Sequence, residues 1–244
     1  TLIRYALKDN TLEFEMRIKE SLNESITSEM FYNVLKRIKG IPSIGFIEEI
    51  DSLDIFLEDY DNIRVTIYGN ENITKYCQTN DIKNIDKKYI EMIKKTSIRH
   101  VDINDYKIRF NLKREEFVDT NTTLQEIMKT WPSLKKMFRY KKRFAYRSAD
   151  NLFQYDLTIV KTSTKKVIRG NNSIMKKKNI KDHMKKYIVR PDYVVDLDKW
   201  FEELNDEDDV EMIGRKITSY IYTKNMQKSN VLENPLDYEI ELEF

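Results

Sequence analysis

The stretch EIELEF, residues 239–244, alternates a carboxylate with an apolar residue at every position. Successive side chains of a β-strand point to opposite faces, so the pattern predicts a strand with Glu239, Glu241 and Glu243 on one face. Three aligned carboxylates repel one another, and neither the segment nor its flanks places a lysine or arginine on that face. A charged strand face is usually a solvated one. This one is costly enough to predict a compensating cation or a basic wall opposite it.

Strands of the same kind recur along the chain, with charged or polar residues at alternate positions. We predict strands at 12–19, 62–69, 106–115, 138–147, 153–160 and 238–244. The first of them, LEFEMRIK, supplies a second pair of carboxylates on one face, Glu13 and Glu15. The middle strands carry basic residues on their polar faces, namely Arg64, Arg109, Lys113, Arg139, Lys141 and Arg143.

Pairing of the first and last strands would close a barrel and bring five carboxylates to one wall. The predicted fold is therefore α+β, a closed antiparallel β-barrel of about eight strands whose polar side chains line a hydrophilic tunnel. Its apolar outer face would pack against helices. Helices are predicted at 27–40, at 85–97, at 122–138 with a break at Pro132, and at 196–206.

The composition narrows the chemistry that such a barrel can perform. With 43 basic and 41 acidic residues the net charge is only +2, so any phosphate binding must come from local clusters. One cysteine and two histidines exclude a disulfide framework and a cysteine-based zinc site, so carboxylates would have to hold a metal. The GxxxxGK[ST] motif of P-loop NTPases is absent from the sequence.

The length and the ends of the chain suggest its organisation. No apolar run approaches the roughly 20 residues of a membrane-spanning helix, so we expect a soluble, intracellular protein without a membrane partner. No linker or fixed repeat divides the 244 residues, and we expect one domain over 1–244. The chain opens on Thr1 and stops inside a predicted strand, so we expect it to be a piece of a longer polypeptide.

Acidic and basic walls that face each other suit phosphoryl transfer. Clustered carboxylates select a hard divalent ion, Mg²⁺ or Mn²⁺. Guanidinium forks and ammonium groups bind phosphate oxygens, and we expect this of the six basic residues named above. Such a site would spread the charge of the transferring phosphoryl group while a carboxylate orients the attacking water.

Three segments of the chain carry a resemblance to a known family: LEFEMRI at 12–18, RYKKRFAYRSADNLFQYDLTIV at 139–160, and YEIELEF at 238–244. They resemble the metal-dependent RNA 5′-triphosphatases of the yeast type, which are triphosphate tunnel metalloenzymes. Within that family they resemble the triphosphatase domain of giant DNA virus capping enzymes, the mimivirus type, over essentially the whole chain. Arg17 stands where tunnel enzymes of the CYTH type often carry lysine, which favours the capping branch.

The resemblance implies roles for the matching carboxylates. It implies direct metal ligands at Glu13, Glu15 and Glu243. It implies that Glu239 and Glu241 hold water on the metal or neighbouring basic side chains. Glu115 matches the glutamate that orients the attacking water, but the surrounding FNLKREE departs from the family pattern, so Glu116 stays open as an alternative.

The resemblance also implies a phosphate-binding set. Arg139, Lys141 and Arg143 match the alternating basic strand that grips the triphosphate. Arg64 resembles a further phosphate ligand. Asp156 and Thr158 match a pair that supports these basic residues and the tunnel wall.

The activity implied by the resemblance is removal of the γ-phosphate from triphosphate-ended nascent mRNA, which leaves the diphosphate end needed for guanylylation, in the first step of cap formation. It implies 5′-triphosphate RNA as partner, guanylyltransferase and methyltransferase domains downstream in the same polypeptide, and a location in the virion or a viral factory in the host cytoplasm. Two alternatives stay open. One is a tunnel phosphohydrolase acting mainly on free nucleoside triphosphates or inorganic polyphosphate; the other is a non-catalytic RNA-binding module of a capping assembly.

Overall fold

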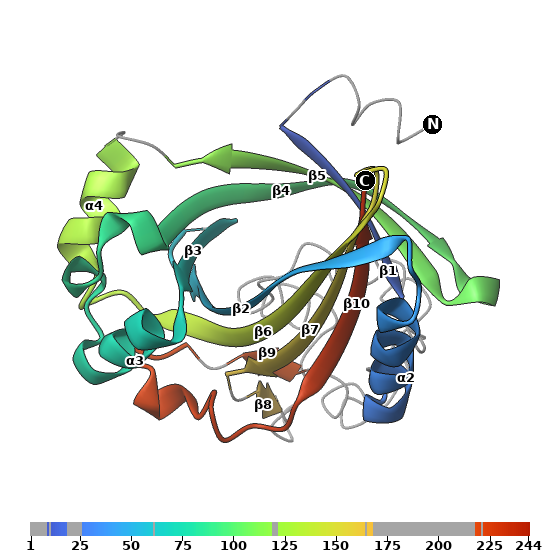
Figure 1. Ribbon diagram of the computed structural model, residues 1–244. Coiled ribbons are helices and arrows are strands. Elements are labelled where there is room, and N and C mark those ends of the chain that lie inside the picture. Colours follow the sequence, from blue (N-terminus) through green and yellow to red (C-terminus); the bar gives the residue numbers. More distant parts are fainter. Residues whose placement is uncertain are drawn as a thin grey trace, which may run out of the picture.

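The computed structural model describes residues 9, 11–18, 26–60, 62–118, 122–163, 165–167, 218–220 and 222–244. In these residues eight antiparallel strands form a closed barrel in the order β1-β10-β7-β6-β2-β3-β4-β5, which confirms the predicted architecture (Figure 1). The strands are β1 (Leu12–Ile18), β2 (Ile44–Leu57), β3 (Ile63–Tyr68), β4 (Ile90–Ile103), β5 (Ile108–Phe117), β6 (Lys136–Ser148), β7 (Gln154–Thr162) and β10 (Asp237–Glu243). A separate small sheet pairs β8 (Lys165–Val167) with β9 (Thr218–Tyr220).

The first and last strands close the barrel as predicted. β1 pairs with β10, and Glu15 lies opposite Glu243 in the register. On its other side β1 pairs with β5, where Glu13 lies opposite Lys113. Because side chains alternate across each strand, this register turns the charged residues of neighbouring strands toward the lumen together.

Two apolar clusters cover the outside of the barrel. The larger joins the outward faces of β2 and β3 to α3 (Asn70–Thr79) and α4 (Thr122–Thr130), around the buried rings of Tyr76 and Trp131. The smaller packs α2 (Ser28–Lys39) against β6, β7 and β10. Figure 1 shows α3 and α4 on one side of the barrel and α2 on the other. Among the described residues, no helix has the length and apolar character needed to cross a membrane.

The helix predicted at 27–40 is confirmed as α2. The side chain of Thr27 caps it by accepting a hydrogen bond from the backbone N–H of Met30 (3.2 Å), and Gly40 follows its last residue. Short 3₁₀ turns connect other elements; they are η1 (Ile82–Asn84), η2 (Lys87–Tyr89), η3 (Asn104–Tyr106) and η4 (Gln227–Ser229).

The helix predicted at 85–97 is wrong, because the chain enters β4 at Ile90. Tyr89, Met92 and Ile93 follow one another at helical spacing, which explains the error. In the structure Met92 packs in the larger outer cluster, whereas Ile93 lines a cavity together with Glu13. Both faces of this part of the strand therefore carry apolar residues, and the alternation that marks a strand is lost.

The prediction of a helix at 122–138 is correct only for its first part. Its first part is α4, the chain turns at Pro132 as expected, and residues from Lys136 onward belong to β6. The helix predicted at 196–206 lies outside the described residues. Strand β2 and helix α3 were not predicted.

Lys136 is a buried cation that joins the turn after α4 to the loop around residue 224. Its side chain is 0% exposed, and its ammonium group donates to the backbone carbonyls of Trp131 (2.7 Å), Leu134 (2.7 Å) and Lys224 (3.3 Å). Burial lowers the pKa of Lys136 to about 8, so at neutral pH all three N–H donors are present.

Replacing Lys136 by methionine is expected to lower the free energy of unfolding by about 3 kcal/mol, because two buried carbonyls and one partly buried carbonyl lose their donor. Urea denaturation measures this loss. The matched control is Lys135→Met, which removes an exposed neighbour paired with Glu58 (2.9 Å) and should cost less than about 1 kcal/mol. Equal stability of the two variants would show that the three carbonyl contacts contribute nothing.

Candidate active site

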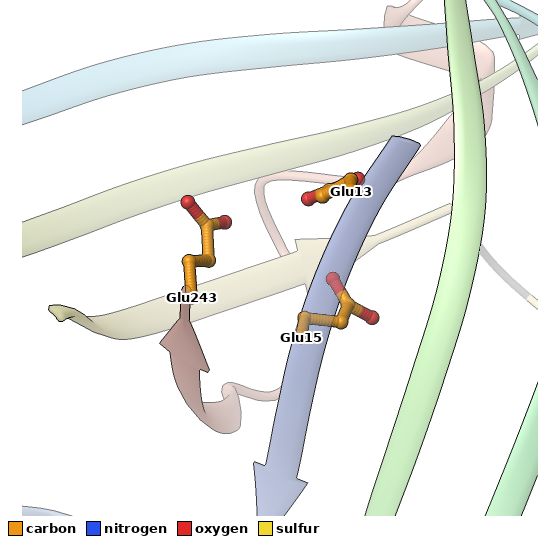
Figure 2. Close-up of side chains that lie close together, drawn as sticks. All are labelled: Glu13, Glu15 and Glu243. Atoms are coloured by element: carbon orange, nitrogen blue, oxygen red, sulfur yellow. The ribbon is translucent and has the colours of Figure 1, made fainter. Parts of the chain in front are cut away.

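Three carboxylates gather where β1 and β10 meet. Oxygen atoms of Glu13, Glu15 and Glu243 all lie within 4.8 Å of one another. Figure 2 shows Glu13 and Glu15 extending from β1 beside Glu243, which extends from the end of β10. The structure therefore brings together the three residues expected to bind a metal.

The three glutamates of β10 differ in their partners. The carboxylate of Glu239 pairs with Arg139, and that of Glu241 pairs with Arg17 (2.5 Å). Glu243 has no ion pair among the described residues. The predicted repulsion within EIELEF is thus relieved at two positions by arginines from other strands and is not relieved at the third.

The pKa values of these glutamates follow from this difference. Burial, together with Asp156 and Glu13, raises the pKa of Glu243 to about 8. Burial alone would also raise the pKa of Glu241, but the neighbouring Arg17 and Lys113 lower it to about 2. Glu241 is therefore a stable carboxylate in an ion pair, whereas Glu243 is buried near other carboxylates, and the nearby Arg143 only partly offsets their effect on its pKa.

The carboxylates of β1 are contacted by donors from β4 and β5. Lys95 of β4 donates to Glu13 Oε2 (2.5 Å) and also pairs with Glu115. Lys113 and Asn111 of β5 donate to Glu15 Oε1, the latter at 2.9 Å. Arg17 Nε lies 2.9 Å from the same oxygen of Glu15.

A basic wall formed mainly by β6 also lines the lumen. Arg139, Lys141 and Arg143 alternate along this strand, and all three are mostly buried. Lys141 pairs with Asp54 (2.7 Å) and Arg143 with Asp156 (3.0 Å). Each predicted phosphate-binding residue of β6 is therefore held in place by a carboxylate on another strand.

Three side-chain donors in and beside this wall have no hydrogen-bond partner in the described part of the chain. They are Arg64 Nε, Arg139 Nε and Thr158 Oγ1, and each is buried. Thr158 lies opposite both Arg143 and Glu239 in the register, which turns its hydroxyl toward the lumen. Buried donors without a partner are uncommon and suit a site that binds an anion.

Asp54 is a site residue that the sequence interpretation missed. It is 0% exposed, and it accepts a hydrogen bond from Thr66 Oγ1 (3.0 Å) in addition to its pair with Lys141. Burial would raise its pKa, but Lys141 and Arg64 hold the pKa of Asp54 well below its ordinary value. The alternation of Ser52 and Asp54 with apolar residues could have revealed it, had residues 52–57 been interpreted as a strand.

Lys95 was also missed, because its segment was predicted to be a helix. Arg109, in contrast, was predicted to bind phosphate, and the structure shows that it donates from Nε and Nη2 to Asp102 (2.6 and 2.7 Å). These two donors are engaged while that pair is intact. Asp102 lies opposite Arg109 on β4, in a segment for which no strand was predicted, so its pairing with Arg109 was not foreseen.

The two candidates for the water-orienting glutamate lie on opposite faces of β5. Glu115 is 32% exposed, pairs with Lys95, and has Arg64 at 3.8 Å. Burial would raise its pKa, but Lys95 and Arg64 lower the pKa of Glu115. A cavity of about 170 Å³ is lined by Glu115, Glu13, Ile93 and other residues. Glu116 is exposed and lies opposite Lys94, on the outer face.

The acidic cluster fits a hard divalent cation. Cis oxygens around Mg²⁺ are about 3 Å apart, so small rotations of the three glutamates would bring their oxygens onto one ion. An oxygen-only ligand set suits a hard divalent ion such as Mg²⁺, Ca²⁺ or Mn²⁺ rather than a softer metal. Burial and the neighbouring Asp156 and Glu13 raise the pKa of Glu243, and a bound cation would favour its carboxylate form.

Comparison with solved structures supports the same fold. No protein-family model and no curated protein sequence matches the chain. A crystal structure of the RNA triphosphatase domain of a trifunctional mimivirus mRNA capping enzyme is similar over 99% of this chain and 83% of its own, with a TM-score of 0.55 and 18% identity. A triclinic structure of the mimivirus capping enzyme triphosphatase gives a TM-score of 0.54 and 15% identity, over 99% of this chain and 84% of its own.

A more distant match is an S. pombe RNA triphosphatase, with a TM-score of 0.44 and 14% identity over 96% of this chain and 70% of that one. At these identities the mimivirus structures establish a common fold. The barrel of about eight strands predicted from the sequence is therefore confirmed at the level of architecture.

Proposed function

We propose that the chain is a divalent-metal-dependent RNA 5′-triphosphatase, which hydrolyses the γ-phosphate of triphosphate-ended nascent mRNA and leaves a diphosphate end. The observation that carries the proposal is the cluster of Glu13, Glu15 and Glu243 in the same lumen as the basic residues of β6. Acidic ligands and basic phosphate-binding groups in one tunnel are what phosphoryl transfer requires. The shared fold with a capping-enzyme triphosphatase supports this choice over other phosphohydrolases.

In this proposal the basic wall binds the triphosphate. Arg64, Lys141 and Arg143 supply charge to the phosphate oxygens, while Arg139 Nε and Thr158 Oγ1 add donors that have no partner among the described residues. Asp54 and Asp156 hold Lys141 and Arg143 in their rotamers (2.7 and 3.0 Å). A charged network that is already in place lowers the cost of reorganisation when the substrate binds.

The acidic wall binds the metal. Glu13, Glu15 and Glu243 would hold Mg²⁺ or Mn²⁺, which supplies Lewis-acid polarisation of the γ-phosphate. Glu241 keeps Arg17 beside Glu15 and so supports the ligand set. Glu239 pairs with Arg139 and fixes one edge of the phosphate site.

Glu115 is proposed to orient the attacking water. Its carboxylate borders the cavity that Glu13 also lines, and its lowered pKa keeps it ready to accept a hydrogen bond from water. In-line attack then places the β-phosphate and the RNA on the far side of the γ-phosphate from Glu115. We further propose that residues 1–244 form one catalytic domain, whose diphosphate-ended product a guanylyltransferase would accept.

The test is release of γ-phosphate from RNA labelled at its 5′-triphosphate. With Mg²⁺ or Mn²⁺ we expect orthophosphate and diphosphate-ended RNA, and with EDTA a rate lower by about 10³-fold. Unlabelled ATP in excess is expected to compete weakly if RNA is the preferred substrate. Equal release in EDTA, or release of pyrophosphate, would contradict the proposal.

A further inference from the structure

Lys95 lies between two carboxylates that have different roles in the proposed reaction. Its ammonium group is 2.5 Å from Glu13, a proposed metal ligand, and it also pairs with Glu115, the proposed water-orienting residue. The side chain is only 22% exposed, so these contacts are shielded from screening by solvent. Lys113 makes the corresponding contact with Glu15.

A divalent ion at the cluster would share Glu13 with this ammonium group. The ammonium group already lies 2.5 Å from the carboxylate of Glu13, so a divalent ion held by the same carboxylate would be within about 5 Å of it. At that distance in a partly buried site, their repulsion is well above thermal energy. The ammonium group of Lys95 and the metal ion therefore oppose each other's binding to Glu13. This electrostatic repulsion remains even if each cation contacts a different oxygen of the carboxylate.

We propose, on the basis of the function proposed above, that Lys95 is an internal counter-ion of the metal site: it restrains the affinity for divalent metal and turns to phosphate oxygens when metal and triphosphate bind together. Metal binding weakens the hold of Glu13 on Lys95, and a polyanion in the lumen offers the ammonium group a new partner. By linkage, triphosphate then raises the affinity for metal, and metal raises the affinity for triphosphate by the same factor. Lys95 thus makes metal binding depend on substrate.

A second account of Lys95 predicts the opposite effect. If Lys95 only holds Glu13 and Glu115 in position, its removal lets the two carboxylates move apart and weakens metal binding. If Lys95 is a competing counter-ion, its removal strengthens metal binding. The sign of the change decides between the two accounts.

The experiment is a Mn²⁺ titration of the full chain followed by electron paramagnetic resonance, which reports free Mn²⁺ and does not depend on turnover. We expect Lys95→Met to lower the Kd for Mn²⁺ by about tenfold. Lys94→Met is the matched control, because Lys94 is the preceding residue and is exposed on the outer face of the same strand. It should leave the Kd unchanged. An unchanged or raised Kd in Lys95→Met would overturn the inference.

A second variant and a second measurement distinguish a change in metal affinity from a loss of folding. Lys113→Met should shift the Kd in the same direction through Glu15, and thermal melting checks that both variants are folded. In turnover, Lys95→Met should need less Mn²⁺ for half-maximal rate and have a lower kcat, whereas a purely structural role would raise the Mn²⁺ requirement. Wild-type γ-phosphate release tests the proposed function separately. If the wild type is active and Lys95→Met has an unchanged Kd for Mn²⁺, this inference alone is rejected.

Discussion

Replacement of Glu243 by glutamine is expected to lower the rate of γ-phosphate release by about 10³-fold, equivalent to about 4 kcal/mol of transition-state stabilisation. Glutamine keeps the shape of the side chain and removes the negative charge that would bind the metal. Glu243 has no ion pair among the described residues, unlike Glu239 and Glu241 of the same strand. The substitution therefore breaks no internal ion pair in that part of the chain.

The stability of this variant is the informative control. With a pKa of about 8, the carboxyl of Glu243 is largely neutral at neutral pH without metal, as an amide would be, so the melting temperature without added metal should hold. A variant that loses activity and keeps its stability is the signature of a site that places like charges together for function. Glu233→Gln, an exposed change just before β10, should alter neither quantity. Full activity of Glu243→Gln would remove Glu243 from the metal site.

The strands with strict alternation were predictable from the sequence because one face is charged and the other is apolar. β1 and β10 are of this kind, and their pairing follows from the need to close the barrel. β4 could not be recognised in the same way. Ile93 faces the lumen among charged residues, and a bulge between Ser97 and Arg99 shifts the register within the strand.

β2 was hidden for a related reason. A register shift between Phe46 and Glu48 interrupts its alternation, and Phe46 is 58% exposed although it is aromatic. Its lumen-facing Asp54 was missed with it. Single-strand patterns therefore identified most of the charged residues of the tunnel, but not those carried by strands whose two faces are both partly apolar.

There is a physical reason why the lumen-facing residues could be predicted but their ion-pair partners could not. Arg143 could be predicted because it lies on a regular strand, but its partner, Asp156, depends on the pairing of β6 with β7. The partner of Glu13 is Lys95, which is 82 positions away in the chain. Sequence periodicity predicts the face of a strand on which a residue lies, whereas ion pairs across the lumen depend on barrel closure.

The second large effect on turnover is expected at Glu115, one of the two candidates for the water-orienting glutamate. Glu115→Gln is expected to lower kcat by about 10² to 10⁴-fold, because an amide cannot accept the proton of the attacking water. Glu116→Gln is the matched control, since Glu116 is exposed on the opposite face of β5 and should leave kcat unchanged. Single-turnover release of γ-phosphate from labelled RNA measures both rates at the chemical step.

Metal binding distinguishes the role of Glu115 from that of the metal ligands. Glu115 lies outside the group formed by Glu13, Glu15 and Glu243, so Glu115→Gln should still bind Mn²⁺, with a much smaller loss of affinity than Glu243→Gln, while its turnover falls. Glu243→Gln should lose both. Complete loss of Mn²⁺ binding in Glu115→Gln would instead assign Glu115 as a metal ligand. Loss of turnover in Glu116→Gln, but not in Glu115→Gln, would assign the water-orienting role to Glu116. Because Lys95 pairs with Glu115 as well as Glu13, Glu115→Gln leaves Lys95 to Glu13 alone, and a small loss of Mn²⁺ affinity is the sign expected of a competing counter-ion.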